Sequence, residues 1–169
     1  MRRVGDLFFG YFDIFDRKNI HHYYYFSVIA EIITHLRDIT TKIGKLGEKI
    51  NIDVSEMGCR SITKLITFFR DALCHNESNN RRNSKGFIFS HNVYAAYDFP
   101  DEITILTGDF RIYVRRHLFL TYIQAIQIFS SYKEFQTNED FSAVLLTVKH
   151  FDVLKNPLLF RNSDPFFEE

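Results

Sequence analysis

Tryptophan is absent from this 169-residue sequence, and cysteine, proline and glycine occur only 2, 3 and 7 times. Cys59 and Cys74 are both predicted to lie on one helix, where a rise of about 1.5 Å per residue puts them too far apart for a disulfide with each other. We therefore expect reduced thiols, as in cytoplasmic proteins. No proline- or glycine-rich linker divides the chain, so residues 1–169 are predicted to form a single domain.

Neither sign of charge dominates, because 21 lysines and arginines balance 21 aspartates and glutamates. Without a polycationic tail, any contact with nucleic acid has to come from a local basic patch. The longest apolar run, residues 23–30, is interrupted by Ser27 and stopped by Glu31, so we predict no membrane span. Asp6 and Asp13 interrupt the apolar stretch near the N-terminus, which argues against a signal peptide and for a cytoplasmic protein.

The sequence motifs of several enzyme classes are missing as well. The glycines form no phosphate-binding loop of the GxGxxG or GxxxxGK(S/T) type. His-Glu-x-x-His and Cys-x-x-Cys do not occur, so a zinc site has no support. The aspartates and glutamates are dispersed, whereas a metal-dependent nuclease needs them clustered. We therefore predict no metal and no cofactor.

Aromatic residues and helical periodicity are what the sequence does have. Its 19 phenylalanines and 9 tyrosines indicate an aromatic-rich core. Apolar side chains recur at helical spacing, with Asp53 and Glu56 placed as a capping box before the third segment. The helices predicted in this way cover residues 3–16, about 20–46, about 54–75 and about 116–135. The fold is thus predicted to be mainly α, a four- to five-helix bundle with its helical core over about 3–135.

In a short segment near residue 108, apolar and polar residues alternate with the period of two that is typical of strands. A two-residue turn at Gly108-Asp109 would join two strands and predicts a small β-hairpin insertion at about 102–115. The cross-strand pairs that follow from this turn are Ile105 with Ile112, Ile103 with Val114 and Thr104 with Tyr113. The apolar segment 136–169 is open to two interpretations, a docking segment packed on the body or a tail that meets a partner.

The most informative stretch is Arg70-Asp-Ala-Leu-Cys-His75, at the polar end of the third predicted helix. Arginine supplies a cation and histidine a near-neutral acid or base, as metal-free cleavage of an RNA phosphodiester requires. Two other Arg/His spacings occur, but Arg17 to His22 falls at a predicted helix break and Arg111 to His117 at a strand-to-helix junction. Only the Arg70 copy lies on one continuous amphipathic helix. The apolar stripe of that helix consists of Ile62, Leu65, Ile66, Phe69 and Leu73.

This stretch resembles the Arg-x4-His signature of the HEPN superfamily of helical ribonucleases, including the polar residue, here Asp71, that follows the arginine. The resemblance implies a metal-independent endoribonuclease whose active site is formed by two copies of the motif helix in a homodimer. It also implies a role in toxin–antitoxin or anti-phage defence systems. RNA and a cognate antitoxin or nucleotidyltransferase-like protein are then the expected partners.

Within this hypothesis Arg70 stabilises phosphorane charge and His75 transfers protons. Asp71 and His75 are four residues apart and share a helix face, so Asp71 is expected to orient the imidazole. Arg70 lies about 140° around the helix from His75 and has to reach around the axis. The residues expected to contact substrate are Asn76, Arg81, Arg82 and Lys85.

The same residues also have a purely structural interpretation. A histidine at a helix C-terminus is favoured by the helix dipole, and a polar basic loop is common on any surface. The alternative function is therefore a non-catalytic HEPN-like helical dimer that binds RNA or a partner protein. A third possibility is an unrelated helical interaction module that uses the apolar C-terminal segment.

Overall fold

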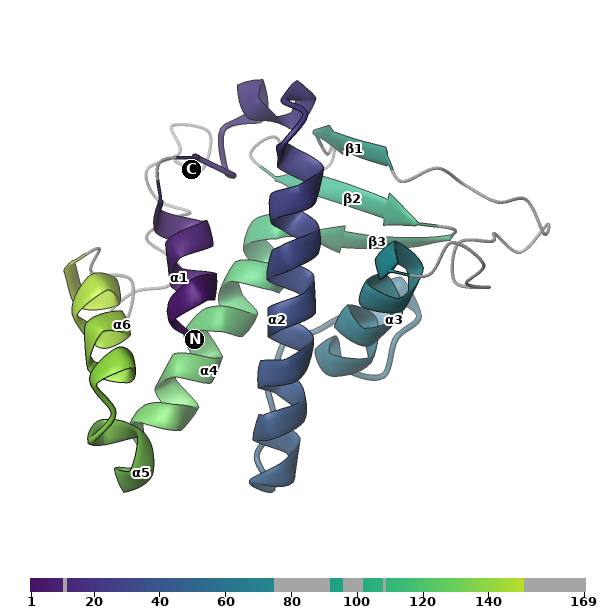
Figure 1. Cartoon of the computed structure of the whole chain (residues 1–169). Helices are drawn as coiled ribbons and strands as arrows, with labels where there is room; N and C mark the ends of the chain where they lie inside the picture. Colours follow the sequence, from purple (N-terminus) through teal and green to yellow (C-terminus); the bar gives the residue numbers. More distant parts are fainter. Residues whose placement is uncertain (11, 75–91, 96–101, 108, 151–169) are drawn as a thin grey trace, which may run out of the picture.

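The computed structural model describes residues 1–10, 12–74, 92–95, 102–107 and 109–150, and it is mainly helical with a small antiparallel sheet (Figure 1). This confirms the predicted fold class at the level of mainly α. The helices are α1 (Arg2–Phe9), η1 (Arg17–His21), α2 (Tyr25–Lys45), η2 (Ser55–Met57), α3 (Ile62–Cys74), η4 (Val114–Phe119), α4 (Leu120–Ser130), α5 (Lys133–Gln136) and α6 (Glu139–His150). The strands are β1 (Asn92–Ala95), β2 (Ile103–Thr107) and β3 (Phe110–Tyr113).

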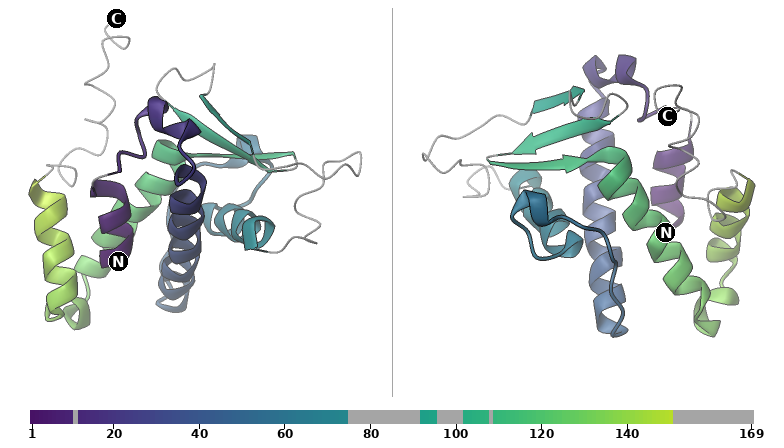
Figure 2. Two further views of the ribbon diagram at one scale, coloured as in Figure 1. Left: turned by 45° about the horizontal axis from the view of Figure 1, so that its top comes forward. Right: turned by 180° about the vertical axis from the view of Figure 1, so that it is seen from behind.

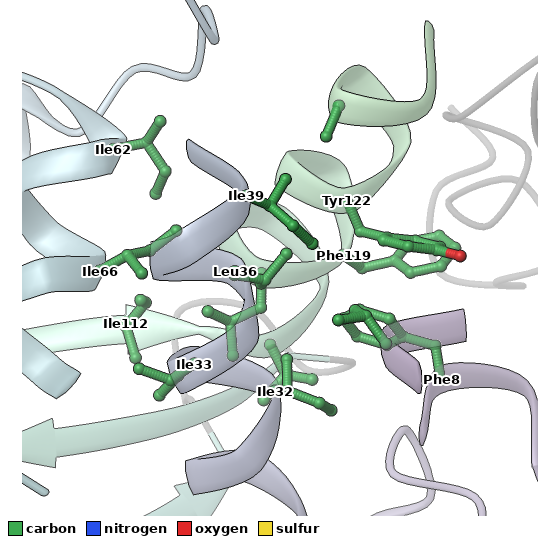
Figure 3. Close-up of a cluster of buried hydrophobic side chains, with 14 of the residues drawn as sticks. Phe8, Ile32, Ile33, Leu36, Ile39, Ile62, Ile66, Ile112, Phe119 and Tyr122 are labelled. Carbon is green, nitrogen blue, oxygen red and sulfur yellow. The ribbon is translucent and has the colours of Figure 1, made fainter. Parts of the chain in front are cut away.

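The long helix α2 runs through the middle of the described fold. Helices α1, α4 and α6 lie on one side of it, and α3 and the sheet lie on the other (Figures 1 and 2). In close-up, Leu36 and Ile39 of α2 lie between Ile66 of α3 and the aromatic rings of Phe119 and Tyr122 (Figure 3). Seven apolar side chains of α2 are buried in one continuous hydrophobic cluster. They are Tyr25, Ile29, Ile32, Ile33, Leu36, Ile39 and Ile43.

The first predicted helix is too long at its C-terminal end, because α1 ends at Phe9 and not near residue 16. Gly10 ends the helix in an extended conformation, and Asp13 and Asp16 keep the residues that follow out of a helix. The Asp13 carboxylate accepts from the backbone N–H of Phe15 at 2.8 Å, and the Asp16 carboxylate accepts from that of Lys18 at 2.9 Å. Such local bonds offer the backbone an alternative to the helix. The chain therefore forms turns and the 3-10 helix η1 before α2 begins.

The third predicted helix begins too early. Asp53 does cap a turn, since its carboxylate accepts from the Ser55 N–H at 2.9 Å, but that turn is only the 3-10 helix η2. Gly58 then takes a left-handed conformation with φ +66°, which suits glycine and ends the helical run. Helix α3 starts afresh after Ser61, whose hydroxyl accepts from the Lys64 N–H at 3.3 Å. Cys59 consequently lies before α3.

The predicted hairpin is confirmed together with its register. β2 and β3 pair antiparallel, with Ile105 opposite Ile112 and Thr104 opposite Tyr113. Two details differ from the prediction. Val114 begins the π-helix η4 and does not continue β3, and β1, which was not predicted, pairs with the other edge of β2 to make a three-stranded sheet.

The predicted helix over about 116–135 is divided into η4, α4 and the short α5. Helix α6 then packs against α1 and buries Phe141 and Val144 in the core, each 3% exposed. Residues 139–145 therefore dock on the body, while residues 151–169 lie outside the described part of the chain. In the part that is described, every helix is too short or too polar to span a bilayer.

We predict that Ile33→Ala lowers the free energy of unfolding by about 2–5 kcal/mol, because the side chain is completely buried in the centre of α2. The exposed Ser27→Ala on the same helix should change it by no more than about 0.5 kcal/mol. Urea unfolding followed by circular dichroism measures both. Equal effects of the two substitutions would show that the α2 face is not the core.

Candidate functional site

The C-terminal turn of α3 carries two of the three predicted catalytic residues. Phe69 and Ala72 are buried against the body and fix the rotation of the helix. Arg70 and Asp71 lie between them in sequence and remain partly accessible, with side chains 32% and 38% exposed. The Arg70 Nη1 donates to Asp71 Oδ1 at 3.0 Å, and this bond raises the pKa of the guanidinium above its ordinary value. Arg70 is therefore a permanent cation held near the surface.

The structure brings Arg70 and Asp71 together, and the Asp71 carboxylate directly contacts the arginine. The predicted catalytic partner His75 lies outside the described residues. The same holds for the predicted substrate-contacting residues Asn76, Arg81, Arg82 and Lys85. The expected contact of Asp71 with His75 thus stays a prediction.

The hairpin packs beside this end of α3. The rings of Phe68 on α3 and Phe110 on β3 are 4.1 Å apart between centroids, and α3 lies next to the strands in Figure 1. Phe110 opens β3 directly after the predicted turn. The hairpin therefore supports the turn of α3 that carries Arg70, a role that the sequence did not indicate.

A second candidate site, which sequence reasoning missed, lies where β3 runs into η4. The carboxylate of Glu102 is 3% exposed and accepts from the backbone N–H groups of Arg115 at 2.8 Å and Arg116 at 3.1 Å. It also accepts from the Ile103 N–H at 3.2 Å. Glu102 thus caps the first turn of the π-helix, and its burial raises the pKa of the carboxyl above the ordinary value.

A cavity of about 290 Å³ lies beside this junction. Its walls come from the segment around η2 and from η4 and the start of α4. The lining residues are Asn51, Ile52, Asp53, Glu56, Arg115, Arg116, His117, Phe119, Leu120 and Gln124. Residues of both charges and one histidine therefore meet in one small space.

His117 is the most buried polar residue of the cavity, at 2% exposed. Its Nδ1 accepts from the Tyr113 backbone N–H at 3.2 Å, so in the neutral ring Nε2 carries the proton. Burial, with Arg116 and Arg111 nearby, lowers the pKa of His117 to about 4. The Arg111 to His117 spacing does fall on a strand-to-helix junction, as predicted. The sequence signal that could have indicated a site there is the run Arg115-Arg116-His117 directly after a strand.

In the described part of the chain, histidine, cysteine, aspartate and glutamate form no group of three or more that could hold a metal ion. Comparison of the sequence with family models, with curated proteins and with solved structures finds no match in any of the three. The two sites, one at the end of α3 and one beside η4, therefore carry the evidence on function.

We predict that the stability of the protein depends on pH through His117. The pKa of His117 is about 4 in the folded chain and about 6.5 when unfolded, so between these values only the unfolded chain binds the proton. Through His117, the free energy of unfolding should therefore fall by about 3 kcal/mol as the pH falls from 6.5 to 4. In His117→Asn, the amide oxygen can still accept from the Tyr113 N–H, and that loss should disappear.

The measurement is urea unfolding of wild type and His117→Asn at several pH values. Only the difference between the two proteins is informative, because Glu102 acts in the opposite direction. Its raised pKa contributes stability at low pH that is lost as the pH rises through the folded value. Identical pH dependence of the two proteins would mean that His117 is not held neutral.

Proposed function

We propose that this protein is a metal-independent endoribonuclease of the HEPN type, with its active site at the C-terminal end of α3. The observation that carries the proposal is the Arg70–Asp71 pair, 3.0 Å between Nη1 and Oδ1, presented at the surface on a helix whose opposite face is buried. A fixed, accessible guanidinium is suited to stabilising a phosphorane. His75, four residues after Asp71 in the sequence, would be the proton-transfer group.

The reaction needs three events at one phosphodiester. The ribose 2′-hydroxyl gives its proton to one histidine, and its oxygen attacks the phosphorus. The bond from phosphorus to the 5′-oxygen breaks, and this oxygen takes up a proton. Arg70 stabilises the negative charge on the phosphorane oxygens in between. The products are a 2′,3′-cyclic phosphate and a free 5′-hydroxyl, and no metal or oxidant takes part.

A homodimer would complete this site. One chain supplies one Arg70 and one His75 in this motif, while the reaction uses both a base and an acid. Two α3 ends facing each other would supply two histidines and two guanidinium groups to one cleft. Asp71 would hold its own Arg70 and orient His75. The substrate-contacting candidates Asn76, Arg81, Arg82 and Lys85 directly follow the motif in the sequence.

The biological setting is proposed on the family resemblance alone. A HEPN-type ribonuclease of this size would act in the cytoplasm as a toxin or an anti-phage effector. Such a toxin would be neutralised by a cognate antitoxin, for instance a nucleotidyltransferase-like protein. This antitoxin would have to cover the accessible C-terminal end of α3.

A second candidate is a non-catalytic HEPN-like dimer that binds RNA or a partner protein. The Arg70–Asp71 ion pair itself favours it, because the adjacent carboxylate partly offsets the charge that a phosphorane would need. In this case Arg70 would be a surface arginine tied to its neighbour. Cleavage assays separate the two candidates directly.

We predict that the purified protein cleaves RNA in EDTA and that Arg70→Ala or His75→Ala slows cleavage by at least about 100-fold. Arg37→Ala is the matched control, because Arg37 makes the same contact with its neighbour Asp38, at 3.0 Å from Nη1 to Oδ1, on α2. It should cleave at the wild-type rate. Single-turnover cleavage of several RNAs, tRNA included, gives the rates, and circular dichroism confirms that each variant is folded.

Equal cleavage by wild type, Arg70→Ala and His75→Ala would reveal a contaminating nuclease or another site and would end the argument from this motif. Absence of cleavage by every protein on every RNA would instead favour the binding module. Binding of the same RNAs, measured by fluorescence anisotropy, would then separate an RNA-binding dimer from a protein-binding one.

A further inference from the structure

The cavity beside η4 has two walls of opposite charge, one formed by η4 and the other by the segment around η2. The π-helix contributes the basic groups Arg115 and Arg116 together with the neutral donor His117. The segment around η2 contributes the carboxylates Asp53 and Glu56, both exposed at the surface, so the cavity is open to solvent. A π-helical turn is rare and is often found at functional sites.

The cavity is held in shape by bonds between distant parts of the sequence. The Gln124 side chain makes two hydrogen bonds to the Asn51 backbone: it accepts from the N–H at 2.9 Å and donates to the carbonyl at 3.0 Å. On the η4 side, the buried carboxylate of Glu102 fixes the backbone of Arg115 and Arg116. Both walls are therefore formed before any ligand arrives, as is usual for small-molecule sites.

The η4 side is suited to an anion. His117 presents an Nε2–H donor, because its Nδ1 is occupied by the Tyr113 N–H. Arg116 is close enough to His117 to lower its pKa, Arg115 lines the same cavity, and arginine is the side chain best matched to phosphate. Arg115 also packs over the Phe15 ring at 4.7 Å, which positions its guanidinium. A phosphate group is the anion that this combination of fixed, planar donors recognises best.

The η2 side excludes a ligand that is anionic throughout. The backbone and side chain of Ser55 hold the pKa of Asp53 below its usual range, so its carboxylate is charged at neutral pH. Asp53 and Glu56 would repel a second phosphate and attract N–H donors. We propose that this cavity binds a nucleoside monophosphate, with its phosphate at Arg115, Arg116 and His117 and an amino-bearing base at Asp53 and Glu56.

The size of the cavity agrees with this occupant. A volume of about 290 Å³ is just below the range of ligand pockets, about 300–1,000 Å³, and suits one nucleotide rather than a longer strand. The described residues that line the cavity include none from α3. The proposal is therefore independent of the ribonuclease hypothesis, and a nucleotide bound there is a ligand of a second site.

The test is isothermal titration calorimetry of the full chain with AMP, adenosine and inorganic phosphate. AMP should bind more tightly than either fragment, because only AMP reaches both sides of the cavity. Arg115→Gln should weaken AMP binding by about tenfold or more, the scale expected for a charge-assisted hydrogen bond. Glu56→Gln should weaken AMP binding by a smaller factor and leave phosphate binding unchanged.

Two controls change the same charges elsewhere. Arg37→Gln on α2 and Glu134→Gln on α5 lie outside the residues that line the cavity, and each should bind AMP within about twofold of wild type. If Arg115→Gln does not fold, Glu56→Gln and the preference of wild type for AMP over adenosine and phosphate decide the question. The same titrations with Arg70→Ala should give wild-type binding, which separates this site from the end of α3.

Three results would overturn the proposal. The first is no heat from wild type with AMP at millimolar concentration, and the second is AMP binding no tighter than that of inorganic phosphate. The third is AMP binding by Arg115→Gln and Glu56→Gln that is as tight as binding by the controls. A loss of RNA cleavage without loss of AMP binding would bear only on the ribonuclease hypothesis.

Discussion

Packing on both sides of α2 is the constraint on which the two candidate sites depend. Its apolar residues meet α3 on one side and α1 and α4 on the other. Arg70 is presented at the surface because the buried stripe of α3 faces α2, and the η4 junction is supported because α4, its continuation, packs on α2 as well. A substitution that leaves a void between α2 and these helices would loosen the packing of α3 and α4 together. Both sites therefore depend on the same buried side chains of α2.

The features that follow from local sequence were predictable. The apolar stripe of α3 and the alternation around Gly108-Asp109 depend on residues close together in the chain, and the structure reproduces the register that pairs Ile105 with Ile112. The placement of Arg70 and Asp71 near a helix end also follows from the stripe alone. Periodicity fixes which face of a helix is buried, and therefore which residues remain accessible.

The features that depend on competing or distant contacts were not predictable. Asp13 and Asp16 keep the residues after the first helix in turns through local side-chain bonds, which an apolar pattern does not reveal. Gly58 falls inside the predicted third helix, and only its positive φ shows that the helical run stops there. The cap that Glu102 places on η4 joins residues about a dozen positions apart across a hairpin. The run Arg115-Arg116-His117 therefore marks the junction in the sequence but does not show that a cavity forms there.

We propose that the end of α3 cleaves RNA through the ribose 2′-hydroxyl. The most direct test is an oligonucleotide that wild-type protein cleaves once in EDTA, remade with a single 2′-deoxy sugar on the 5′ side of that bond. Cleavage at this bond should be lost, and the unmodified RNA should yield a 2′,3′-cyclic phosphate and a 5′-hydroxyl. Cleavage at the 2′-deoxy position, or products with a 5′-phosphate, would contradict it.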